Sequence, residues 1–204
     1  MGETSKVGIS ASKVVALIGA LVVIQVSIEY FTTGVVLTII YGIIGLIIAA
    51  VIFISLEIVD MKKVRITYLW WINLIIGALL LLFEFSVGSS YLGGILVLIA
   101  ALLEFLSQKK TYAESKIVAL IGACYLIFES VMLFLSGSTT SIALSIVGFV
   151  FAIILILTLQ NKIDVGVPYA WWVVLIIGFV VFTWVTPVSG TIIMVAFILI
   201  LMAF

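Results

Sequence analysis

The sequence predicts an all-α integral membrane protein with eight transmembrane helices. This prediction depends on the length of the apolar runs, the placement of the basic residues and an internal duplication. Of the 204 residues, 66% are hydrophobic and 9% are charged, whereas a soluble domain is about half apolar and about a quarter charged. A soluble fold of this size cannot bury so much apolar surface, so lipid must surround most of the chain.

The apolar runs have roughly the length that a helix needs to cross the hydrocarbon core, which is about 17–25 residues, although the last run is short. Strands of a membrane β-barrel would be about ten residues long with alternating polarity, so these continuous runs exclude a barrel. Polar segments with the sequences TTG, SVGSS, SGSTTS and TPVSG predict the turns on one side. The predicted spans are residues 13–31, 35–57, 67–86, 91–107, 115–135, 140–160, 168–186 and 189–204.

The basic residues predict the orientation, because short loops rich in Lys and Arg mark the cytoplasmic face. All nine lie on one side of the predicted spans, and an even number of spans then places both termini in the cytoplasm. Four tryptophans begin helices at the same face and are expected to anchor in the interface: Trp70, Trp71, Trp171 and Trp172. The basic residues are Lys6, Lys13, Lys62, Lys63, Arg65, Lys109, Lys110, Lys116 and Lys162.

The chain contains a tandem duplication. The sequence SKVVALIGA at 12–20 recurs as SKIVALIGA at 115–123, and YLWWINLIIG at 68–77 recurs as YAWWVVLIIG at 169–178. Each repeat has an even number of helices and keeps its orientation, which predicts a pseudo-two-fold axis along the membrane normal. A fainter recurrence of glycine predicts four helical hairpins. The expected organisation is a cytoplasmic N-terminal segment 1–12, a first four-helix repeat 13–107, a cytoplasmic linker 108–114 and a second four-helix repeat 115–204.

The segment WWINLIIGALLLLFEF resembles the two-helix hairpins of SPW-repeat membrane proteins, which pair a Trp-x-Asn start with a glycine in the next turns. The recurring hairpins with glycine near the helix centres are also similar to HdeD-like small membrane proteins. The Ser-Pro-Trp signature is missing here, and Asn73 of the first repeat is replaced by Val174 in the second. The resemblance implies a hairpin-repeat architecture over most of the chain and no particular activity.

Small residues recur at matched positions of the helices. Lipid provides no hydrophobic drive for helix association, so close packing through small residues must provide much of it. We therefore expect the recurring glycines to mark helix–helix contacts, with a cavity or pore lined by small residues as the alternative. These glycines are Gly19, Gly45, Gly77, Gly122, Gly148 and Gly178.

Several chemistries are excluded by residues that the sequence lacks. It has no histidine and only one cysteine, Cys124, which rules out a disulfide within the chain and metal sites built from His and Cys. No glycine-rich phosphate loop followed by lysine occurs, and the loops are too short for a catalytic domain. The formal net charge is zero, which gives no indication of nucleic-acid binding. We therefore expect no enzyme, no cofactor and no metal.

One group of polar residues within the spans is a candidate site, since an ionisable residue at a helix centre costs about 2.5–3.5 kcal/mol. Glu84 and Glu129 each follow a shared glycine by seven residues, in the matching contexts LLFE and LIFE. Glu29 lies close to the same helix face of the first span, with Gln25 one turn further inward. Glu129 lies deepest, which predicts either a site for a proton, cation or amine or a structural hydrogen bond across a helix interface.

Two functions remain open from the sequence. The first is a non-catalytic scaffold or accessory subunit that packs against other membrane chains, or against copies of itself, within the lipid bilayer. The second is a small transporter or channel for protons, cations or a small solute that uses the glutamates in the outer halves of the helices. A dry bundle packed through glycine favours the first function, and a water-filled cavity beside the glutamates favours the second.

Overall fold

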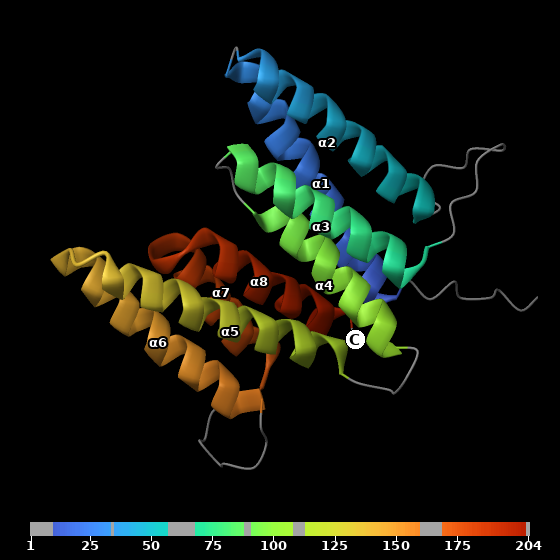
Figure 1. The fold of residues 1–204 in the computed structure, drawn as a ribbon. Coiled ribbons are helices and arrows are strands. Elements are labelled where there is room, and N and C mark those ends of the chain that lie inside the picture. Colours follow the sequence, from blue (N-terminus) through green and yellow to red (C-terminus); the bar gives the residue numbers. More distant parts are fainter. Residues whose placement is uncertain are drawn as a thin grey trace, which may run out of the picture. The chain divides into compact units, whose positions relative to one another are not determined.

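The computed structural model describes residues 10–33, 35–56, 68–87, 91–107, 113–159 and 169–202. Within these ranges every regular element is helical and no strand occurs (Figure 1). Four helices are long and apolar enough to cross a membrane: α1 (Ala11–Thr32), α2 (Val36–Ser55), α5 (Glu114–Leu135) and α6 (Thr139–Leu159). The prediction of an all-helical, multi-pass membrane protein is confirmed at this level.

The other four helices are apolar but shorter. They are α3 (Trp70–Val87), α4 (Leu92–Ser107), α7 (Trp171–Val180), which continues into the π-helical turn η1 (Val181–Val185), and α8 (Pro187–Leu201). At about 1.5 Å per residue, the 15 residues of α8 reach less far than the core of about 30 Å. That these four helices also cross the membrane stays a prediction.

The break between η1 and α8 is shorter than the sequence indicated. The segment TPVSG predicted a turn, but α8 already begins at Pro187 and only Thr186, in an extended conformation with φ −150° and ψ 132°, separates the two helices. Proline suits the first position of a helix because its missing N–H would have no intrahelical partner there. The predicted start of the last span at residue 189 is therefore two residues too late.

The chain divides into two compact units, Met1–Lys110 and Thr111–Phe204. In the first unit α1 packs against α2 and α4, and α3 packs against α4. In the second unit α5 packs against α6 and α8, and α7 packs against α8. The same order of neighbours therefore occurs twice, as a duplicated four-helix unit requires. The N-terminal segment as far as residue 9 and residues 108–112 of the predicted linker lie outside the described residues.

The six glycines singled out in the sequence are buried where neighbouring helices meet. A Cβ atom at Gly19 would lie 3.1 Å from Val97 Cγ2, and one at Gly122 would lie 2.8 Å from Ile193 Cγ1. Both distances are shorter than ordinary van der Waals contact, so a side chain there would push the helices apart. The glycines and their neighbours are Gly19 with Val97, Gly45 with Ser27, Gly77 with Leu98, Gly122 with Ile193, Gly148 with Ser130, and Gly178 with Met194.

The π-helical turn lies where α8 comes closest to the preceding helix. The Thr186 N–H donates to the carbonyl of Val181, five residues earlier, over 2.9 Å. A Cβ atom at Gly190 would overlap the backbone of Phe182, so only glycine allows this approach. In the first unit the corresponding Gly94 lies against Leu81, within a regular stretch of α3. The second unit thus differs from the first at the end of its third helix.

Candidate functional site

Glu129 lies on α5 and is hydrogen-bonded to the first turn of α8. Its Oε2 atom accepts a hydrogen bond of 3.3 Å from the Ser189 N–H and another from the Ser189 hydroxyl. The Thr186 hydroxyl lies 2.9 Å from the Ser189 hydroxyl and extends this network. Ser189 is completely buried, whereas Glu129 is partly buried.

These contacts give the Glu129 side chain a structural role. The first N–H groups of a helix have no intrahelical acceptor and need one from elsewhere. The side chain of the residue just before the helix normally provides this acceptor. Thr186, the residue before α8, makes no such bond to the backbone. Glu129 of α5 accepts the hydrogen bond from the Ser189 N–H instead. A carboxyl oxygen can accept these bonds in either protonation state. Glu129 therefore fastens α5 to the start of α8.

The corresponding place in the first unit lacks this network. At the constant shift of 103 residues between the repeats, Glu129 corresponds to Val26 on α1. By the matched glycines Gly94 and Gly190, Ser189 corresponds to Gly93. The hydrogen bonds that join Glu129 of α5 to Ser189 of α8 are therefore a feature of the second unit.

Gln25 and Glu29 lie together on an exposed face of α1. The Gln25 Nε2 atom donates to Glu29 Oε1 over 3.2 Å, and both side chains are exposed within their unit. The backbone of Glu84 is part of α3, but its side chain lies outside the described residues. Since Glu29 and Glu129 belong to different units, the predicted shared pocket for Glu129 with Glu29 or Glu84 stays a prediction.

A second polar cluster joins the start of α1 to the end of α4. The Ser12 hydroxyl donates to Glu104 Oε2 over 2.6 Å. The Tyr68 hydroxyl is buried and lies near both residues. Lys13 Nζ lies 5.9 Å from the centre of the Tyr68 ring, which is within the range of a cation–π interaction.

The second unit repeats part of this cluster. Lys116 Nζ lies 5.8 Å from the centre of the Tyr169 ring, and Ser115 is a neighbour of that tyrosine. Neither cluster was predicted from the sequence, although the Ser, Lys and Tyr residues of both lie within the duplicated motifs. Of the nine basic residues that predict the orientation, Lys13 and Lys116 are described, and the other seven lie outside the described residues.

The four tryptophans begin their helices as the sequence indicated. Trp71, Trp171 and Trp172 are exposed, as interfacial anchors would be. Trp70 is partly buried and packs against Phe105, with ring centres 5.0 Å apart. Their exposure fits contact with lipid headgroups, and their anchoring role stays a prediction.

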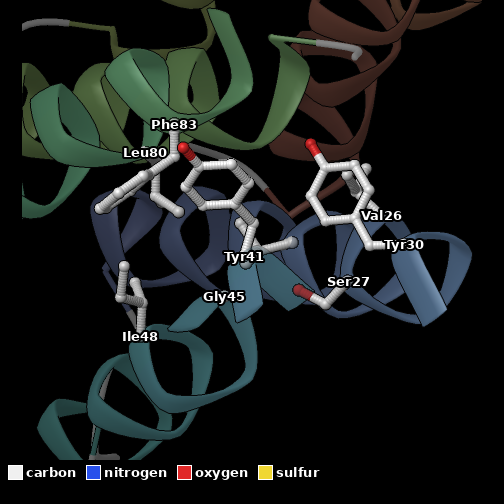
Figure 2. Close-up of a pocket in the computed structure, with 9 residues that line it drawn as sticks. Val26, Ser27, Tyr30, Tyr41, Gly45, Ile48, Leu80 and Phe83 are labelled. Carbon is white, nitrogen blue, oxygen red and sulfur yellow. The ribbon is translucent and has the colours of Figure 1, made fainter. Parts of the chain in front are cut away.

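A crevice lies between α1, α2 and α3 of the first unit (Figure 2). The centre of a water-sized sphere can occupy about 20 Å³ of it, and its unoccupied space including the open mouth is about 320 Å³. About 10–15 Å³ of the first kind of space holds one water molecule, so the crevice has room for one or two. Its walls are apolar apart from three hydroxyl groups, and the lining residues include Ser27, Tyr30, Tyr41, Gly45, Leu80 and Phe83. Among the described side chains, no carboxylate lines it.

Among the described residues, no group of three or more His, Cys, Asp and Glu side chains is arranged to hold a metal ion. The chain matches no protein-family model, no curated protein and no solved structure.

Proposed function

We propose that this chain is a non-catalytic membrane scaffold or accessory subunit, with eight transmembrane spans, two related four-helix repeats and both termini in the cytoplasm. One observation carries the proposal: Glu129, the deepest of the candidate glutamates, is hydrogen-bonded to the buried Ser189 at the start of α8. Its side chain is thus used to hold two helices together.

The outward faces of α2 and α6 support the same proposal. On α2 the exposed residues Ile40, Ile43 and Ile47 recur every three or four positions and form one apolar stripe. On α6 Ile146 and Val150 occupy the matching positions. Such stripes suit contact with lipid or with the apolar surface of another membrane chain. A scaffold needs surfaces of this kind, and it needs no reactive group.

The transport alternative requires an ionisable side chain beside a path for water or ions. Among the residues that the structure describes, no carboxylate lines the crevice of the first unit; the side chain of Glu84, which follows the lining residue Phe83, lies outside them. In the second unit the carboxyl group of Glu129 faces hydroxyl and N–H groups at the start of α8. This geometry favours the scaffold over the transporter.

Site-specific photo-crosslinking in native membranes tests the proposal. A photoreactive residue replaces Ile43 on α2 or Val150 on α6, and the buried Ile52 is the control position. We expect one or a few discrete adducts with other membrane chains, or with a second copy, from the exposed positions only. The proposal is wrong if purified protein in liposomes carries a proton or cation flux that Glu129→Gln abolishes while the fold is kept.

A further inference from the structure

Ser27 on α1 carries a buried hydroxyl group that lacks a hydrogen-bond partner. The residue is 2% exposed, and its hydroxyl makes no hydrogen bond to the other described residues. Two other buried hydroxyls bond back to their own helices: Ser55 donates to the Ile52 carbonyl over 2.8 Å, and Thr158 donates to the Leu155 carbonyl over 2.7 Å. Burying an unpaired hydroxyl is costly, so its position on α1 indicates a partner other than these residues.

The Ser27 side chain lies at the wall of the crevice between α1, α2 and α3. Figure 2 shows its oxygen turned towards α2 at Gly45, which lines the same crevice. A Cβ atom at Gly45 would overlap Ser27 Oγ. The missing side chain of this glycine therefore leaves room for the hydroxyl group beside the crevice.

The crevice has the size and the polar groups that a bound water molecule requires. A water site needs about 10–15 Å³ of space for the centre of the molecule, and two to four polar partners. The crevice offers about 20 Å³ of such space. Ser27, Tyr30 and Tyr41 bring hydroxyl groups to its walls, and the other lining side chains are apolar. Both the space and the polar groups therefore suit one or two water molecules.

We propose that this crevice is a hydration site, in which one or two water molecules bind the Ser27 hydroxyl between α1, α2 and α3. Water both donates and accepts hydrogen bonds, so it supplies the partner that Ser27 lacks. Buried waters of this kind are part of a fold and are costly to remove. The site takes water and no larger ligand, and its presence does not depend on the scaffold function.

X-ray hydroxyl-radical footprinting of the full-length protein in lipid nanodiscs tests the proposal. Radicals formed from a bound water oxidise the side chains beside it, and mass spectrometry measures the oxidation rate of each residue. Leu80 is the reporter, because it lines the crevice and is buried. Leu96 is the control, because it is a buried leucine of the same unit and is not among the lining residues. We expect Leu80 to be oxidised at least fivefold faster than Leu96, and equal rates would overturn the proposal.

Two serine variants test whether Ser27 holds the water. Ser27→Ala removes the hydroxyl group and little volume, and we expect the oxidation rate of Leu80 to fall at least threefold. Ser130→Ala removes a completely buried hydroxyl at the matched position of the second unit, and it should leave that rate unchanged. An unchanged rate in Ser27→Ala, or an equal fall in both variants, contradicts the role of Ser27. If Ser27→Ala does not fold, the comparison of Leu80 with Leu96 in the wild type decides whether the crevice holds water.

Discussion

The hydrogen bonds between Glu129 and the start of α8 allow a quantitative prediction. Glu129→Leu removes the acceptor of the Ser189 N–H, which belongs to a completely buried residue. The Ser189 hydroxyl keeps Thr186 as a neighbour at 2.9 Å, so the N–H is the group that loses its partner. A buried donor without a partner costs about 1–3 kcal/mol.

The cost of the unpaired N–H is smaller in a membrane, because the unfolded chain also finds polar partners within the bilayer. We therefore expect Glu129→Leu to lower the free energy of unfolding by about 1–1.5 kcal/mol. For a chain of this size, 1 kcal/mol corresponds to about 2–4 °C in Tm, so the expected fall is about 2–6 °C. Thermal unfolding in a mild detergent, followed by circular dichroism, measures it.

Glu129→Gln is the matched control. Glutamine has nearly the same shape and keeps a side-chain oxygen that accepts a hydrogen bond, so its Tm should stay within about 1 °C of the wild type, a change of less than about 0.5 kcal/mol. A double-mutant cycle of Glu129→Leu with Ser189→Ala isolates the coupling between the two side chains. If glutamine destabilises as much as leucine, or if both are silent, the structural role inferred for Glu129 is refuted.

Three further predictions concern other parts of the chain. Gly190→Ala adds a methyl group that overlaps the backbone of the π-helical turn, and no change of rotamer relieves this overlap. Tm should therefore fall by the equivalent of about 1–3 kcal/mol. Thr191→Ala on the same helix is the control and should change Tm by less than half as much. Glu104→Leu removes the acceptor of the 2.6 Å hydrogen bond from the Ser12 hydroxyl of α1 and should lower the free energy of unfolding by about 1 kcal/mol. Glu104→Gln keeps an acceptor and should lower it by less than half as much in the same thermal-unfolding assay. In a cysteine-free background, an impermeant thiol reagent added outside should label Ser138→Cys and not Lys63→Cys, and labelling of the latter would reverse the predicted orientation.

The repeated part of the fold could be predicted from the sequence. The motif that contains Gly19 and Gly122 indicated close helix contacts, and both glycines lie against the fourth helix of their unit. Local composition is sufficient here, because only a small residue allows two helices to approach closely in lipid. The matching contact of Ser27 with Gly45 and of Ser130 with Gly148 could have been found in the same way, by comparing the polar residues of the two repeats.

The partner of Glu129 could not be predicted in this way. Ser189 lies 60 residues further along the chain, and the sequence placed it in a turn. Whether two such residues meet depends on how α5 and α8 cross and where α8 begins. The glutamate's depth indicated that it needed a partner, and only the tertiary structure identified that partner.

The sequence by itself determined the solvent of this protein, its helical class and its duplication, because these depend on the length and composition of each segment. The tertiary structure decided where the two units differ. The π-helical turn at Val181–Val185 follows α7 in the second unit, whereas the matching α3 of the first unit is an α-helix throughout, from Trp70 to Val87. These differences depend on small shifts of one helix against another, which side-chain contacts from several segments set together, and no single segment of the sequence records them.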